Sequence, residues 1–186
     1  LGWLNYEVAF AGAKSQHKLG PAETNTKQAQ GLFVVLPPKE VTEVIADPYE
    51  GNWFYYSGAG NDLDNWMVKP FTLGPGSSLT AMVNHQIELD WDYAYVVLSL
   101  DDGATWITLP NEHSTNVDPN GQNFGNGITG DSGGWQTLTA DLSAYNGDVL
   151  LGFRYWTDPF VTEPGFMVDN IQVSGYPVDG AEVVDP

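Results

Sequence analysis

Short runs of apolar residues recur along the whole chain, separated by glycine, proline, asparagine and aspartate. Runs that are rich in β-branched and aromatic residues and end at turn-forming residues predict β-strands. The segments with this pattern are 31–36, 53–56, 79–83, 86–100, 105–109, 149–156 and 166–173. Residues 24–30 carry the only helical pattern, and it is short. Because strands do not alternate with helices, we expect an all-β protein: a two-sheet antiparallel β-sandwich of jelly-roll type, with a short strand-rich N-terminal segment.

Two connections between the predicted strands carry further information. Asp101-Asp102-Gly103 separates two apolar runs, and an Asp-Gly pair in that position predicts a hairpin turn. Residues 111–134 are rich in Asn, Gly, Asp, Ser and Thr, and a connection this long is either disordered or functional. We expect an ordered loop, held by turns, a metal ion or both. The polar residues that would form a ligand-binding site in this loop are Asp118, Asn120, Gln122 and Asn123.

Composition supports a folded domain and narrows the range of partners. Hydrophobic residues make up 42% of the 186 residues, which is enough to form a core. The net charge is −18, from 24 acidic residues against 6 Lys and Arg, so we expect binding neither to nucleic acid nor to anionic membranes. No run of 18 apolar residues exists, so we expect no membrane span. The chain has no cysteine, which excludes disulfides and cysteine-bound zinc.

Charge is divided unevenly along the chain, which suggests a boundary between two units. Residues 1–39 hold four lysines and two glutamates, whereas residues 40–186 hold 22 acids and only two basic residues, Lys69 and Arg154. Prolines between the two parts mark turns. We therefore expect a strand-rich connector segment at 1–46 and a jelly-roll β-sandwich domain at 47–176.

Sequence signatures of common catalytic sites are missing. The three histidines, His17, His85 and His113, do not form His-Glu-x-x-His, the zinc-binding motif of many metalloproteases. Neither a Gly-x-Ser-x-Gly elbow nor a Walker-type phosphate loop is present. We therefore expect no catalytic residue and no zinc in this chain.

Carboxylates remain as the candidate chemistry. The segment Asn61-Asp62-Leu63-Asp64-Asn65 supplies many oxygens in five residues, and Ca²⁺ binds six to eight oxygen ligands. The segment lacks EF-hand spacing, and a polar turn between two strands is the alternative interpretation. We expect Asp62 and Asp64 to be ligands of a structural calcium ion.

Glu88, Asp90 and Asp92 alternate along one predicted strand, and a period of two places them on one face. Like charges on one face need a positive partner, either a metal ion or one of the basic residues Lys69 and Arg154. A solvated acidic face and an acid–base pair for glycoside hydrolysis are the alternatives. We expect Asp90 and Asp92 to be further calcium ligands.

Asp169 interrupts an apolar strand, where a carboxylate without a partner is costly. A metal ion or Arg154 would satisfy it, and we include Asp169 among the expected calcium ligands. Some of the seven tryptophans would suit a carbohydrate-binding surface, although core packing is the commoner use of aromatic residues on strands.

Longer motifs run from about Lys18 to Val173. They include Lys18-Leu19-Gly20-Pro21-Ala22-Glu23, Tyr56-Ser57-Gly58-x-Gly60, Asp90-Trp91-Asp92-Tyr93-Ala94-Tyr95-Val96, Asp118-Pro119-Asn120-Gly121-Gln122-Asn123, Asp141-Leu142-Ser143-Ala144-Tyr145 and Phe153-Arg154-Tyr155-x-Thr157-Asp158. These motifs resemble the region that follows the catalytic domain in the immune inhibitor A family of secreted bacterial zinc metallopeptidases.

The resemblance implies a non-catalytic β-region similar to a MAM-type jelly roll, and similar modules often carry structural calcium. It implies that the chain is an internal piece of a larger secreted, extracellular bacterial protein, with residues 177–186 as a linker toward a further domain. The expected partners are the catalytic domain of the parent protease and a protein or glycan substrate. A carbohydrate- or matrix-binding (adhesion) module is the alternative function.

Overall fold

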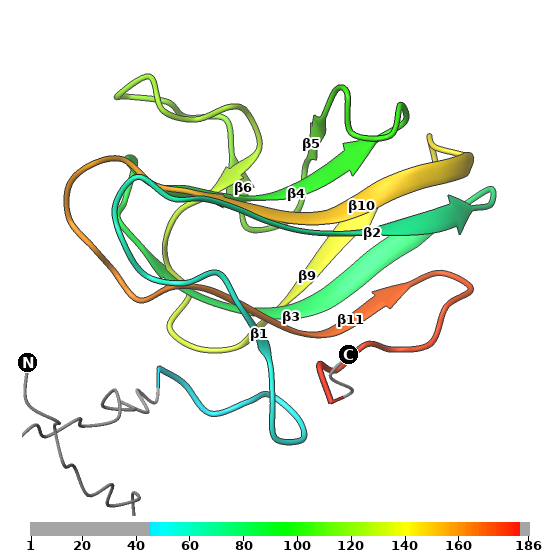
Figure 1. The fold of residues 1–186 in the computed structure, drawn as a ribbon, viewed down its shortest axis with the longest axis horizontal. Helices are drawn as coiled ribbons and strands as arrows, with labels where there is room; N and C mark the ends of the chain where they lie inside the picture. The colour runs from blue at the N-terminus through cyan, green and yellow to red at the C-terminus, as the bar shows by residue number, and fades with distance from the viewer. Residues whose placement is uncertain (1–44, 183–186) are drawn as a thin grey trace, which may run out of the picture. The chain divides into compact units, whose positions relative to one another are not determined.

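Alternating burial along the strands explains why the chain folds into two layers. The computed structural model describes residues 45–182. In β3 (Ser78–Ile87) every second side chain is buried, and β9 (Gln136–Asp141) shows a similar alternation. Because successive side chains on a strand point to opposite faces, each sheet buries one face against the other. Two antiparallel sheets form the sandwich, which confirms the predicted fold class (Figure 1).

The first sheet is built around β3 and β11 (Gly165–Val173). These strands pair antiparallel, with a register shift between Asp169 and Gln172. The short strand β1 (Tyr55–Tyr56) pairs with the other side of β11. Beyond β3, β9 and the short β8 (Gly130–Asp131) pair with different parts of that strand.

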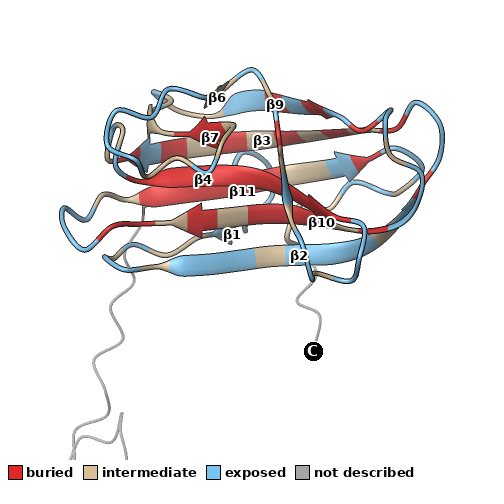
Figure 2. Cartoon of the chain, turned by 90° about the horizontal axis from the view of Figure 1, so that it is seen from above, coloured by how far each residue is buried: buried red, intermediate tan, exposed pale blue. Residues whose placement is uncertain are grey.

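The second sheet has β10 (Gly147–Trp156) between β2 (Asp64–Leu73) and β4 (Tyr93–Ser99). β5 (Ile107–Leu109) and β7 (Gly127–Ile128) pair with β4, and β6 (Ser114–Thr115) pairs with β7. Among the described strands β2 forms the edge of this sheet, and most of its side chains are exposed, as Figure 2 shows. The chain passes repeatedly between the two sheets, as expected for a jelly roll.

Strand β4 is buried on both faces. Ala94, Val96 and Leu98 face the core between the sheets, whereas Tyr93 and Tyr95 lie in a second cluster with Val97. The loop at 111–134 covers this second cluster, and its Phe124 ring stacks on Tyr95 with 5.7 Å between centroids. This packing fixes part of a loop that has few apolar residues of its own.

The hairpin predicted at Asp101–Gly103 is confirmed, because β4 and β5 pair across it. The prediction of one strand over 86–100 is wrong. β3 ends at Ile87, residues 88–92 form a turn, and β4 begins in the other sheet at Tyr93. Glu88, Asp90 and Asp92 therefore do not line one face of a strand.

Residues near both ends of the described range contact one another. Ile171 and Asp179 exchange two backbone hydrogen bonds of 2.8 Å, and the Glu182 carboxylate accepts the backbone amides of Asn52 and Trp53.

The predicted connector up to residue 44, with its strand at 31–36 and helical pattern at 24–30, lies outside the described residues. The domain boundaries and the linker role of 177–186 stay predictions. Within residues 45–182, no helix is long and apolar enough to cross a membrane.

Candidate metal centre

Two arches at one end of the sandwich bring three carboxylates together (Figure 1). The first arch, residues 88–92, links β3 of one sheet to β4 of the other. The second arch, residues 157–164, links β10 back to β11 and is drawn in orange. Both arches therefore join the two sheets.

The first arch is a tight turn closed by its own backbone. The amides of Trp91 and Asp92 donate to the Glu88 carbonyl at 3.3 and 3.1 Å. Asp90 has φ of 64°, in the left-handed region that Asp tolerates better than most residues. The Thr129 hydroxyl donates to the Glu88 carbonyl at 3.0 Å and accepts the Asp90 amide at 3.1 Å. These bonds hold Glu88 and Asp92 in defined positions.

The second arch begins with Asp158, which is held from several sides. Its backbone amide donates to Asp92 Oδ1 at 2.8 Å, so the two arches are bonded directly. Its carbonyl accepts the Asp62 amide at 2.8 Å, and its Oδ1 accepts the Phe160 amide at 2.8 Å. The Asp158 carboxylate therefore has little freedom to leave the first arch.

Glu88, Asp92 and Asp158 form what we call the acidic cluster. Each offers one carboxylate oxygen, and these oxygens lie within 4.8 Å of one another. Asp92 is 1% exposed and Asp158 is 4% exposed, whereas Glu88 is half-buried. Glu88 Oε2 and Asp92 Oδ2 are buried, and within residues 45–182 they accept no hydrogen bond. An unsatisfied buried oxygen is costly, so this arrangement fits a positively charged ligand.

Burial and like charges oppose ionisation in the acidic cluster. Burial is the main cause that raises the pKa of Asp92 to about 6, and the carboxylates of Asp158, Glu88 and Glu163 act in the same direction. The pKa of Glu88 is also raised, by burial and by Asp158 and Glu163. The hydrogen bond from the Asp158 amide lowers the pKa of Asp92 but does not cancel these effects.

The basic side chains of the described residues are paired elsewhere. The Lys69 ammonium lies 3.8 Å from Asp179, and Arg154 forms two bonds with Asp64 at 2.8 and 3.0 Å. Within residues 45–182 these are the only Lys and Arg. Lys69 and Arg154, the alternatives to a metal ion beside the first arch, are therefore engaged by other acids.

Of the five predicted calcium ligands, only Asp92 belongs to the acidic cluster. Asp64 is engaged by Arg154, and Asp62 lies in the adjoining loop with φ of 55° and its amide on the second arch. Asp90 lies on the first arch, where its carbonyl accepts from the Asn120 side chain at 3.0 Å.

Asp169 lies apart from the cluster and is fully buried. Its Oδ2 accepts the amides of Tyr49 and Glu50 at 3.0 and 3.1 Å, and its Oδ1 accepts the Asn170 amide at 2.7 Å. Backbone amides therefore supply the partners that the sequence required. Arg154, the alternative partner considered for Asp169, is bonded to Asp64 instead.

Of the four polar residues predicted for ligand binding in the 111–134 loop, Asp118 and Asn123 hold the loop together through their side chains. Asp118 Oδ1 accepts the amides of Gln122 and Asn123 at 2.8 and 3.0 Å. The Asn123 side chain donates to two carbonyls of the same loop, and Asn120 reaches the first arch. The expected turns are present, and a ligand-binding role stays a prediction.

Sequence reasoning missed two members of the cluster as ligands. Glu88 was grouped with Asp90 and Asp92 but was not chosen, and Asp158 was quoted only within a motif. Both residues lie within two positions of the end of a strand, where the chain turns between the sheets. This position is the signal that could have identified them as candidate ligands.

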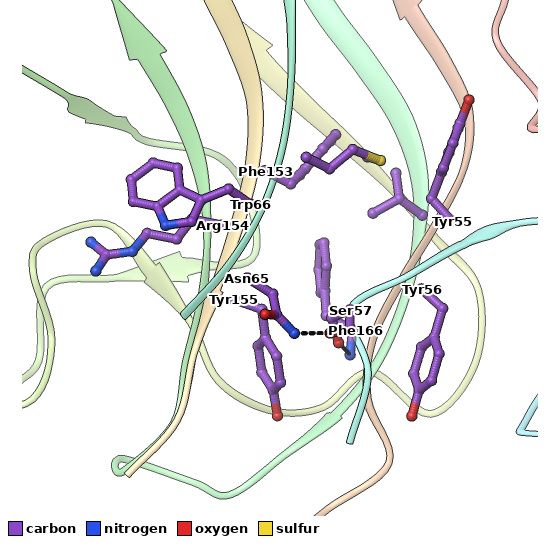
Figure 3. Close-up of a pocket in the computed structure, with 11 residues that line it drawn as sticks. Tyr55, Tyr56, Ser57, Asn65, Trp66, Phe153, Arg154, Tyr155 and Phe166 are labelled. Atoms are coloured by element: carbon purple, nitrogen blue, oxygen red, sulfur yellow. Dashed lines mark hydrogen bonds between the residues drawn. The ribbon is translucent and has the colours of Figure 1, made fainter. Parts of the chain in front are cut away.

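A separate cavity of about 240 Å³ lies between β1, β2, β10 and β11 (Figure 3). Aromatic side chains dominate its lining, and the Asn65 side chain donates to the Ser57 carbonyl at 2.8 Å. Arg154 is the only charged residue of the lining, and Asp64 already pairs with it.

Comparisons with known proteins identify similar sequences. A family model described as "Immune inhibitor A-like, MAM domain" matches residues 15–185. The chain is 34% identical, over 98% of its length, to the pre-pro-metalloprotease PrtV of Vibrio cholerae serotype O1, strain M66-2. The same values hold for PrtV of strain ATCC 39315 / El Tor Inaba N16961. The chain spans 19% of the length of these relatives.

Proposed function

The chain belongs to the immune inhibitor A-like MAM domain family, and we propose that it is a non-catalytic accessory module of a secreted bacterial zinc metallopeptidase. In this proposal it supports the protease domain or helps to engage the substrate, and bound calcium stabilises it. The proposed location is extracellular.

One observation carries the accessory role: the chain corresponds to 19% of relatives that are named metalloproteases. That the parent of this chain is a metalloprotease as well is part of the proposal. The sequence contains no His-Glu-x-x-His, so the zinc ligands and the peptidase chemistry would be supplied by another part of the parent protein.

The fold suits a supporting role. The two sheets enclose a continuous core, and the Glu182 carboxylate accepts the backbone amides of Asn52 and Trp53. The acidic cluster supports the calcium part of the proposal, because two of its buried oxygens lack a partner.

Removal of the module from the parent protease tests this role. We expect the enzyme without residues 45–182 to cleave a short peptide substrate but to lose activity faster on heating, or to cleave protein substrates less well. The matched control is the full parent with Asp102→Asn, an exposed change in the β4–β5 turn. Equal thermal persistence and equal cleavage of both substrates by the shortened enzyme would contradict the proposal.

A carbohydrate- or matrix-binding module is the second candidate, because aromatic side chains gather on the outer face of the second sheet. Trp66 and Trp106 lie 4.9 Å apart, and the Arg154 guanidinium lies between the rings of Trp66 and Phe124. Trp66 and Phe124 remain substantially exposed. A glycan array with the wild-type chain and with Phe124→Ala tests this candidate, which requires binding that the substitution weakens.

A further inference from the structure

We propose that Glu88, Asp92 and Asp158 bind one calcium ion that joins the two arches. This inference rests on the calcium stabilisation in the proposed function and gives it a site. Two of the three residues, Glu88 and Asp158, are not among the ligands expected from the sequence. The ion would connect the end of β3, in one sheet, with the start of β4 and the end of β10, in the other.

The unsatisfied oxygens are the first argument. Asp92 is almost completely buried, one of its oxygens accepts the Asp158 amide, and the other accepts no hydrogen bond from any described residue. Glu88 Oε2 is buried and unpartnered as well. Buried carboxylate oxygens normally accept hydrogen bonds or bind metals, because the loss of hydration otherwise destabilises the folded state.

The geometry is the second argument. Two oxygens on opposite sides of a Ca²⁺ ion at about 2.4 Å are about 4.8 Å apart. The three offered oxygens lie within that distance of one another, so one ion can contact all three with only small side-chain adjustments. The half-buried position of Glu88 leaves room for water molecules to complete the coordination shell.

The chemistry of the donors selects a hard cation. All three donors are carboxylates, and within residues 45–182 no Lys or Arg is left to neutralise them. Calcium accepts irregular sets of six to eight oxygens, whereas Mg²⁺ requires near-ideal octahedral geometry and loses its water reluctantly. Three carboxylates on two separate turns therefore favour Ca²⁺ over Mg²⁺.

Thermal melting of the metal-stripped 186-residue chain tests the proposal. We expect millimolar Ca²⁺ to raise the melting temperature by about 5–10 °C, the shift for a ligand at roughly a hundred times its Kd on a domain of this size. Mg²⁺ at the same concentration is expected to give a clearly smaller shift. Calorimetric titration should give one Ca²⁺ per chain.

Variants assign the ion to its site. Asp92→Asn and Glu88→Gln should abolish most of the Ca²⁺-dependent shift but should melt without metal at or above the temperature of wild type, because each removes one repelling charge. A purely structural role would instead lower the metal-free melting temperature. The matched control Asp102→Asn removes the same charge at the opposite end of β4 and should keep the full shift.

The outcomes separate this inference from the proposed function. A Ca²⁺ shift that survives in both cluster variants would contradict this site and place the calcium elsewhere. No shift in the wild-type chain, or an equal shift with Mg²⁺, would contradict the calcium assignment. Neither result bears on the accessory role, which is tested in the parent protease.

Discussion

Asp169 and Asp92 are both nearly completely buried, at 0% and 1% exposure, but their surroundings differ. Asp169 accepts three backbone amides, two of them from residues 49 and 50 at the start of the described range. Asp92 accepts one amide, leaves its second oxygen without a partner, and lies beside two more carboxylates. Backbone amides satisfy the Asp169 carboxylate, whereas no donor among the described residues reaches Asp92 Oδ2.

This difference indicates how a buried acid is used. A carboxylate surrounded by backbone amides stabilises its own ionised form and anchors the segments that donate. A carboxylate among other carboxylates is unfavourable until a cation binds, so the free energy of folding becomes linked to that cation.

Replacement of Asp169 should have the largest effect. In Asp169→Ala the amides of Tyr49, Glu50 and Asn170 lose their acceptor, and we expect a loss of at least about 3 kcal/mol, or roughly 6–12 °C in melting temperature. The loss should be the same with and without Ca²⁺. Asp169→Asn, which keeps one acceptor, should lose less. A loss seen only in Ca²⁺ would indicate that Asp169 is a ligand.

The pH dependence of the stability of the metal-stripped chain should show the cost of ionising the buried acidic cluster. Because the folded-state pKa of Asp92 is raised from 3.8 to about 6, its protonated form contributes stability below about pH 4 that is lost as the pH rises through about 6. Asp92→Asn imitates the neutral form at every pH. The variant should therefore gain stability relative to wild type between about pH 4 and 7, by at most about 3 kcal/mol.

Melting of wild type and Asp92→Asn side by side isolates this effect. This comparison is needed because burial also lowers the pKa of His85. The stability that neutral His85 contributes is lost as the pH falls below about 6.5, whereas the contribution of protonated Asp92 is lost as the pH rises. The difference between Asp102→Asn and wild type should stay flat over the same range. A flat difference for Asp92→Asn as well would contradict the account of the cluster.

Disruption of the Asp64–Arg154 pair should have the smallest effect. The Asp64 side chain is 50% exposed, and pairs of this kind contribute about 1 kcal/mol or less. Asp64→Asn should therefore lower the melting temperature by no more than about 4 °C and leave the Ca²⁺-dependent shift intact. Loss of that shift would indicate that Asp64 is a calcium ligand.

The sequence predicts the sandwich better than the site. Buried strands such as β4 and β11 are continuous apolar runs, and the Asp-Gly hairpin after β4 has its own turn chemistry. β2 has no such pattern, because an edge strand exposes most of its side chains and includes Lys69 and Pro70. Its first residue, Asp64, was therefore interpreted as part of a loop.

The acidic cluster could not be assembled from sequence spacing. Glu88 and Asp92 lie on a turn inside a run that alternates like a strand, so the crossing between sheets was not visible. Asp158 is 66 residues from Asp92, and only the pairing of β10 with β4 brings it there. The need of Asp169 for a partner was predictable, but its donors are backbone amides, which no side-chain pattern reveals.

Anomalous diffraction from crystals of this chain grown with Ca²⁺ tests whether the acidic cluster binds a calcium ion. We predict one strong peak at the junction of the two arches, with oxygens of Glu88, Asp92 and Asp158 at about 2.3–2.6 Å from the ion. Crystals of Asp92→Asn grown in the same solution should lack this peak. No peak at the acidic cluster in the wild-type chain, or a calcium ion held by other acids, would contradict the account.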